Sequence, residues 1–422
     1  MGDRIRFFLR RLGEKLWVKP LVMCIFSIAA VFLTKTVDYA GLDEFFPDIT
    51  RESIEVLLVN LSASMLVIAT FAVGSMVQAY ASASKTATPR CFSLIVADDV
   101  SQNALSTFIG VFIFSIIAII PLKNGYYDIA GRFALFALTL VALVIVVLTL
   151  VRWIDRIARL GRLGTTISKV EAATTEALLR RRGAPYMKAL PLSAGEISGL
   201  PVYSEKIGYV QRVDVSELQS VAKKQEVRIA VASLPGTFCV PGKPLVWVRT
   251  ETGESPDIDT RAIAKAFRVG KDRTFDEDPR FGFIVLAEIA DRALSPAVND
   301  PGTAIDVINV SVRLFALWTG PVEARDKIEH DRVEVPGLST WDMLDDIYTP
   351  IADSGADSIE VVIRLLKAFH ALASMGDLTL RDAALYHARL AAARADIALA
   401  LPEDRERVRK VAAFEGDLFR EV

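Results

Sequence analysis

The first third of the chain carries four long runs of apolar residues separated by short polar stretches. A helix needs about 20 predominantly apolar residues to cross the hydrocarbon core of a bilayer. Residues 16–34, 56–77, 104–122 and 133–151 meet this requirement. A cleaved signal peptide is the alternative for the first run, but no small-residue cleavage site follows it and three further runs come after. We therefore predict a domain of four transmembrane helices over residues 1–151.

The cationic residues near the ends of these runs predict the orientation of the chain. Lys and Arg concentrate on the cytoplasmic side of membrane proteins. One side collects the cations of the N-terminal arm, of the loop after the second run and of the segment after the fourth run. The opposite side offers only Lys35, Arg51, Lys123 and Arg132, and its first loop is acidic. Both termini are therefore predicted to be cytoplasmic.

The second run differs from the others because polar and small residues recur along one side of it. At helical spacing, Asn60, Ser64, Phe71, Ser75 and Gln78 fall near one stripe. One interpretation is a helix that lines a polar path in an oligomer. The other is a helix that packs at the centre of the bundle, where small residues let backbones approach closely. The packing interpretation is favoured, because the run holds no charged residue.

Residues 152–422 have the composition of a water-soluble region with three parts. Residues 152–188 continue the fourth run and predict a helical stalk. Residues 189–257 alternate with period two and hold Pro-Gly turns, which predicts a small β-sandwich-like domain. At the level of fold this pattern looks like the biotinyl/lipoyl-type sandwich, although no lysine occupies the modified turn of that family. Residues 258–422 return to helical spacing and predict a cytoplasmic helical domain.

The predicted fold is therefore a four-helix membrane domain followed by a cytoplasmic α+β region. Two helix starts stand out in that region, where Asp278 and Asp300 each precede a proline. Aspartate at the N-cap followed by proline at the first helical position is a strong start signal.

Composition and motifs exclude several kinds of chemistry. The net charge of −2 argues against nucleic acid as a partner, because phosphate binding needs a concentrated cationic surface. The three cysteines and three histidines are scattered without paired spacing, so neither a metal site nor a catalytic Cys/His arrangement is expected. The acidic residues 276–278 read as a solvated loop, and phosphate-binding glycine motifs are absent. We expect no cofactor, and an enzyme is not favoured.

The loop between the two aspartate-capped helices is the candidate site of the soluble region. The second helix begins at Asp300, and the free N–H groups at such a helix start favour an anion. A small anionic ligand or a subunit contact is one interpretation. The other interpretation, which is favoured, is that these residues only end one helix and begin the next, with Asp300 as the N-cap. The residues concerned are Asp291, Arg292, Ser295, Asn299, Asp300 and Thr303.

The same loop carries a family resemblance. Residues 291–304, DRALSPAVNDPGTA, resemble the RALSPxxNDPxTA signature of a bacterial family of predicted membrane proteins, domain of unknown function 2254. Residues 88–90, 107–110, 208–244 and 278–282 also follow the order of that family, whereas residues 82–89 depart from it. The resemblance implies a multi-pass protein of the bacterial inner membrane. It implies no particular activity.

Three hypotheses for function follow. The first is an oligomeric channel or transporter-like protein whose second spans surround a polar path gated by the cytoplasmic domain. We expect such a protein to be a symmetric homo-oligomer, since four spans leave little room for an internal pore. The second is a membrane-anchored sensor or scaffold whose cytoplasmic domain binds a ligand or protein partner. A membrane enzyme is the weakest hypothesis, because clustered acids or histidines at the membrane edge are missing.

Overall fold

The computed structural model describes residues 17–40, 46–86, 88–91, 94, 99–159, 163–192, 199–250, 258–321, 327–375 and 377–413. The cationic N-terminal arm, residues 160–162 of the predicted stalk and residues 251–257 of the predicted β domain lie outside this part of the chain. Two compact units make up the protein, Met1–Thr166 and Ile167–Val422.

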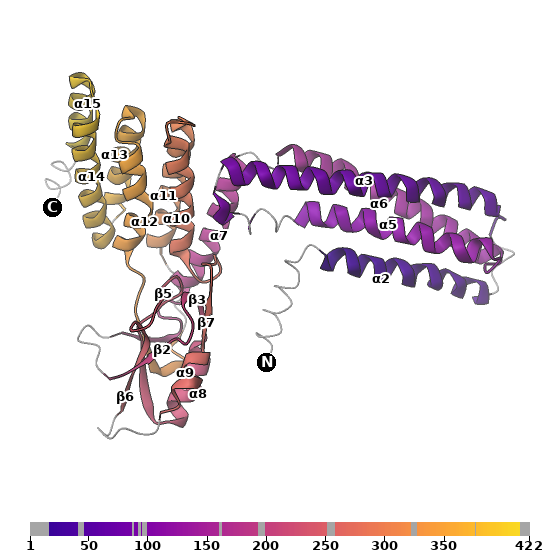
Figure 1. The fold of residues 1–422 in the computed structure, drawn as a ribbon, viewed down its shortest axis with the longest axis horizontal. Helices are drawn as coiled ribbons and strands as arrows, with labels where there is room; N and C mark the ends of the chain where they lie inside the picture. The colour runs from indigo at the N-terminus through magenta and orange to yellow at the C-terminus, as the bar shows by residue number, and fades with distance from the viewer. Residues whose placement is uncertain are drawn as a thin grey trace. The chain divides into compact units, whose positions relative to one another are not determined.

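The first unit consists mainly of four long helices that lie side by side (Figure 1). They are α2 (Val18–Leu33), α3 (Arg51–Thr86), α5 (Asp99–Lys123) and α6 (Ile129–Arg159), with short 3-10 turns η1 (Thr34–Ala40) and η3 (Pro89–Cys91). Within the described residues, four helices are long and apolar enough to cross a membrane, which confirms the predicted number. Helix α3 has 36 residues. At 1.5 Å per residue it is about 54 Å long, well beyond the ~30 Å hydrocarbon core.

The core of the first unit runs along one side of α3. Its buried residues recur every three or four positions, which is the spacing of one helix face. They pack against α5 and α6, where Phe108 and Trp153 contact each other edge to face with ring centroids 6.3 Å apart. The buried row of α3 is Ile54, Leu58, Leu61, Met65, Ala69, Ala72, Met76 and Tyr80.

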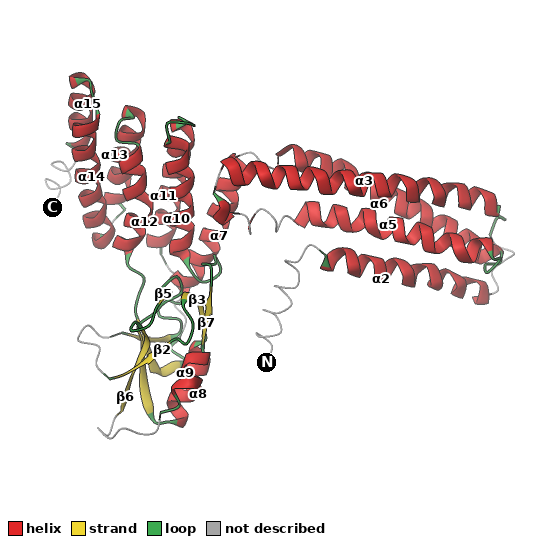
Figure 2. Cartoon of the chain, in the orientation of Figure 1, coloured by secondary structure: helices red, strands yellow, loops and turns green. Residues whose placement is uncertain are grey.

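The second unit begins with an α/β module built on two sheets, which Figure 2 shows as strands and flanking helices. The larger sheet has the strand order β1-β8-β4-β6-β2 and the smaller one β5-β3-β7. Their strands are β1 (Ala189–Pro191), β2 (Leu200–Tyr203), β3 (Gly208–Val213), β4 (Val227–Val231), β5 (Phe238–Cys239), β6 (Pro244–Thr250), β7 (Phe267–Gly270) and β8 (His330–Val335).

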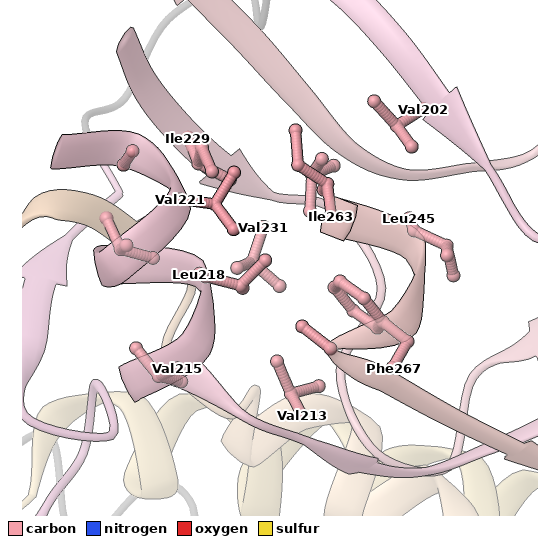
Figure 3. Packing of buried hydrophobic residues seen from close by; sticks show 14 of the residues in the cluster. Val202, Val213, Val215, Leu218, Val221, Ile229, Val231, Leu245, Ile263 and Phe267 are labelled. Carbon is pink, nitrogen blue, oxygen red and sulfur yellow. The ribbon is translucent and has the colours of Figure 1, made fainter. Parts of the chain in front are cut away.

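Helices α8 (Val215–Lys224) and α9 (Thr260–Lys265) complete the α/β module. Figure 3 shows apolar side chains of both helices, among them Leu218, Val221 and Ile263, gathered with Ile229 and Val231 of β4. The module therefore has one continuous apolar core.

The pairing of β8 distinguishes this module from the pattern expected from sequence. Strand β8 pairs in parallel with both β1 and β4. It comes from residues 330–335, within the charged stretch 323–335 that the sequence predicts to be extended inside the helical domain, whereas β7 comes from a part predicted to be helical. The structure thus has a mixed α/β region with sheets, and the closer likeness to a biotinyl/lipoyl-type sandwich stays a prediction.

The rest of the second unit is a bundle of helices that run side by side (Figure 1). The predicted starts at Asp278 and Asp300 are confirmed, since each carboxylate accepts a hydrogen bond from the backbone N–H three residues later, at 3.2 and 3.1 Å. The bundle helices are α10 (Pro279–Leu294), α11 (Pro301–Thr319), α12 (Thr340–Ser354), α13 (Ile359–Ala373), α14 (Leu378–Ala398) and α15 (Pro402–Ala412).

Helix α7 (Leu163–Gly183) follows the last membrane helix in sequence and is held by this bundle. A Cβ on Gly282 of α10 would lie 1.9 Å from the hydroxyl oxygen of Thr174, so only glycine permits this close helix packing. On the α11 side, Arg313 donates two hydrogen bonds to Glu171, at 2.8 and 2.9 Å. Residues 167–183 of α7 are therefore firmly attached to the bundle.

The segment that precedes α10 is built around a buried ion pair. Arg273 donates two hydrogen bonds to Asp278, at 2.7 and 2.9 Å, and Asp278 also caps α10. Arg280, in the next turn, reaches Asp346 of α12 at 2.6 Å. The family-like residues 278–282 thus have a structural role, which is to join the start of α10 to its surroundings.

A buried histidine lies inside the bundle. His387 of α14 is buried, and its imidazole stacks on the ring of Phe369 with centroids 6.1 Å apart. Burial lowers the pKa of His387 below its usual value. The charged groups that influence it are Asp345, whose carboxylate lies 3.6 Å from Nε2, and Arg394.

We expect this histidine to make the bundle less stable in acid. As the pH falls below about 6.5, the unfolded chain binds a proton that the folded state rejects, so stability is lost until the pH passes the lowered pKa of the folded state. Thermal unfolding of the full-length protein in detergent, between about pH 7.5 and 5.5, measures the effect. His387→Gln should flatten this part of the pH profile. An identical slope in the variant would assign the acid sensitivity to other groups.

Candidate functional site

The six predicted site residues lie around the loop that connects α10 and α11, with Asp291 and Arg292 in the last turn of α10 and Thr303 in the first turn of α11. Ser295 donates from its hydroxyl to the carbonyl of Arg292 at 2.7 Å, and Asp291 accepts from Ser354. Asn299 is exposed and has a φ of +50°, in the left-handed region that asparagine tolerates. The loop is therefore held by a local bond at Ser295 and by a bond from α12 to Asp291.

The start of α11 in this loop is occupied by the chain's own carboxylate. Asp300 accepts from the N–H of Thr303 at 3.1 Å and from its hydroxyl at 2.6 Å. That carboxylate sits where a bound anion would lie. The geometry fits helix capping, and a ligand or interface role for this loop stays a prediction.

The polar stripe of α3 occupies a different face from the buried row. With about 100° between successive residues, the stripe lies roughly a third of a turn from the row that packs against α5 and α6. Asn60, Ser64 and Gln78 are exposed, Ser75 is half-buried, and Phe71 is 66% exposed. Phe71 also contacts Trp153 of α6 edge to face, with ring centroids 6.1 Å apart, so the stripe is partly in contact with its own bundle and otherwise exposed.

Hydrogen bonding separates the stripe from other polar residues of α3. Ser62 and Thr70 lie off the stripe, and their hydroxyls donate to the carbonyls of Val59 and Leu66 of the same helix, at 2.8 and 2.9 Å. The stripe residues behave differently. Four of them form no side-chain hydrogen bond with another described residue: Asn60, Ser64, Ser75 and Gln78.

A groove of about 600 Å³ lies at the end of α3 that carries Gln78. Three of the five predicted stripe residues line it, together with Gly74, Ala79, Ser82 and Ile157 of α6. Ile157 was not predicted from sequence, because its position beside α3 depends on how α6 packs.

Two glycines of the first unit show which helix contacts are made inside the chain. A Cβ on Gly110 of α5 would lie 3.2 Å from the Cβ of Met23, so this glycine serves the close packing of α2 on α5. A Cβ on Gly74 of α3 would meet no atom of the described chain within 4 Å. Glycine inside a helix costs about 1 kcal/mol relative to alanine. At Gly74, no close contact within the described chain requires a glycine, so packing inside one chain does not offset this loss of helix stability.

Among the described residues, no group of three or more His, Cys, Asp or Glu side chains is placed to hold a metal ion. Two of the three cysteines, Cys91 and Cys239, are buried, whereas Cys24 in α2 is half-buried. Burial raises the pKa of Cys91 to about 12. A thiol with such a pKa stays protonated at neutral pH and is a poor nucleophile.

The fold defines a class of protein in which four apolar helices precede a mixed α/β region. Residues 13–371 match the model of a family described as "Predicted membrane protein (DUF2254)". The chain therefore belongs to this family, as the resemblance implied. The match includes the four long helices, the α/β module and most of the bundle, and it ends within α13.

Relatives with curated records carry no further information on activity. Uncharacterized proteins of Mycobacterium bovis and Mycobacterium tuberculosis are 33% identical to the chain over 115 residues. That stretch is 26% of this chain and spans only 22% of the length of each relative. No solved structure matches the chain.

Proposed function

We propose that this protein is a homo-oligomeric channel or transporter-like protein in which the α3 stripes of several copies surround a polar path. The stripe is mostly exposed and its polar side chains form no hydrogen bond with another described residue, and this observation carries the proposal. From Asn60 to Gln78 it extends over about 27 Å at 1.5 Å per residue. That length is close to the ~30 Å thickness of the hydrocarbon core.

The polar side chains of the stripe are more stable against a partner helix or water than against lipid. An amide group placed in hydrocarbon without a hydrogen bond costs about 2–7 kcal/mol. A monomer would leave the amides of Asn60 and Gln78 facing lipid or the lipid interface. In a symmetric ring, the same stripes face one another or a hydrated path, while the remaining exposed face of α3, with Val59, Leu66 and Val77, suits lipid.

The proposed orientation places both termini in the cytoplasm of a bacterium, with the helices in its inner membrane. The asymmetric distribution of Lys and Arg supports this orientation. The second unit is proposed to gate the path. Helix α7 supports gating, because it follows the last membrane helix in sequence and its residues 167–183 are bound to the bundle through Thr174 and Glu171.

A flux measurement tests the proposal. Full-length protein reconstituted into liposomes should release trapped ions or small solutes faster than empty liposomes. Asn60→Leu should change the rate by about tenfold, which corresponds to ~1.4 kcal/mol in the barrier. Thr70→Val is the matched control, since the hydroxyl of Thr70 bonds its own helix and lies off the stripe. Liposomes that remain sealed at every membrane potential, pH and ligand condition would rule out transport.

A membrane-anchored sensor is the second candidate function. One observation favours it, a cationic cavity on the α/β module of the soluble unit.

A further inference from the structure

A cavity of about 830 Å³ opens on the α/β module where the turn after β2 meets α9 and β7. The turn contributes Ser204 and Lys206, and α9 contributes Arg261 and Lys265. Phe267, on β7, is buried in the core of the module. The cavity falls within the range of 300–1,000 Å³ that is usual for small-molecule sites.

Positive charge dominates the lining of this cavity. Four cationic side chains, Lys206, Arg261, Lys265 and Arg268, face a single carboxylate, Glu205, which gives a formal net charge of +3. The whole chain has a net charge of −2. The excess of cations is therefore a local property of the cavity.

Three of these cations lack a carboxylate partner in the described part of the chain. Lys206, Arg261 and Lys265 form neither an ion pair nor a side-chain hydrogen bond there. Arg249 of the same module, by contrast, lies 3.4 Å from Glu334. Among the described residues, therefore, no carboxylate neutralises Lys206, Arg261 or Lys265, and these three side chains can bind an anion from solution.

The local structure keeps these charges close together. Arg261 and Lys265 are four residues apart on α9, and like charges at this spacing destabilise a helix by about 0.2–0.5 kcal/mol. Ile263, on the other side of α9, is fully buried in the core and holds the helix in place. In the turn, the hydroxyl of Ser204 accepts from the N–H of Lys206 at 3.0 Å and donates to its carbonyl at 2.7 Å. Both cationic segments are therefore ordered before any ligand arrives.

We propose that this cavity binds a small, water-soluble anion that carries two or more phosphate groups. Phosphate oxygens accept hydrogen bonds from guanidinium and ammonium groups, and arginine can make two such bonds at once. Several phosphates match several cations in one cavity of limited size. The inference stands apart from the proposed transport, because binding is measured directly and without flux.

Isothermal titration of the full-length protein in phosphatidylcholine nanodiscs tests this inference, with sodium tripolyphosphate as the probe. We expect tripolyphosphate to bind more tightly than orthophosphate, and added NaCl to weaken binding. The double substitution Arg261→Gln and Lys265→Gln should weaken binding at least tenfold. Lys206→Gln, in the separate turn, should weaken it by a smaller factor and does not alter α9.

The matched control is the double substitution Lys223→Gln and Lys224→Gln in the last turn of α8, which removes the same charge from the same module. It should change the affinity less than twofold. Equal losses in the two double variants, or no binding of tripolyphosphate to the wild type, would overturn the inference. So would tighter binding of soluble dihexanoyl phosphatidic acid, which would indicate a lipid headgroup, or of a short single-stranded oligonucleotide.

Discussion

Gly74→Leu is expected to dissociate the proposed oligomer and to leave the fold of each chain intact. A Cβ at this position meets no atom of the described chain within 4 Å, and Gly74 lines the groove of about 600 Å³, so one protomer has room for a larger side chain. Between protomers, a leucine would hold two α3 helices apart where a small residue lets their backbones approach. We expect the dissociation constant of the oligomer to rise at least tenfold, which is about 1.4 kcal/mol.

Size-exclusion chromatography with light scattering, in a mild detergent, measures this effect. Val73→Leu adds bulk to the neighbouring exposed face of α3 and should keep the oligomer. Gly110→Leu should instead damage the packing of α2 on α5 within one chain, because Met23 already lies against Gly110. An oligomer that survives Gly74→Leu unchanged would exclude this face of α3 as the interface. A monomeric wild-type protein would remove the oligomer altogether.

Asp278→Ala is expected to cause the largest loss of stability in the second unit. The carboxylate of Asp278 is 4% exposed, makes two hydrogen bonds to Arg273 and caps α10. Removing one member of a buried ion pair leaves the other without compensation, which costs about 3–5 kcal/mol. The lost cap adds about 1 kcal/mol. Asp278→Asn should be less severe, because asparagine retains the cap.

Urea unfolding of the full-length protein in detergent, followed by tryptophan fluorescence, measures this loss. Asp276→Ala is the control two residues away, where the aspartate is exposed. It should change the free energy of unfolding by less than about 0.5 kcal/mol. Similar unfolding midpoints for Asp278→Ala and Asp276→Ala would contradict the role assigned to the ion pair.

Local patterns were sufficient for much of the architecture. The four membrane helices could be predicted because each run of apolar residues has to satisfy its backbone within one helix when it lies in lipid. Asp278 and Asp300 could be predicted as caps because aspartate followed by proline acts on the next three residues alone. Strands β7 and β8 could not be placed in this way. Their pairing with β3, β1 and β4 depends on residues far away in sequence.

The candidate sites were likewise predictable where they depend on residues close in sequence, and not where they depend on tertiary packing. The spacing of Asn60, Ser64, Phe71, Ser75 and Gln78 placed them on one helix face without any structure. In the single chain that face is mostly exposed and is separate from the buried row of α3, although Phe71 contacts Trp153, and both interpretations of it stay predictions. The sequence contains only a weak signal for the cationic cavity, which is the pair of like charges Arg261 and Lys265 at helical spacing. Lys206 joins them only through the folding of the module.

By itself, the sequence determined that this protein has four apolar helices, which caps begin α10 and α11, and to which family the chain belongs. These properties depend on residues that are neighbours along the chain, where hydrophobicity and hydrogen bonding act over a few positions. Only the tertiary structure decided that the stripe of α3 lies on a different face from the row that packs against α5 and α6. It also decided that three cations without an ion-pair partner among the described residues share one cavity. Both results depend on which helix faces pack together, and packing is set by contacts between distant segments.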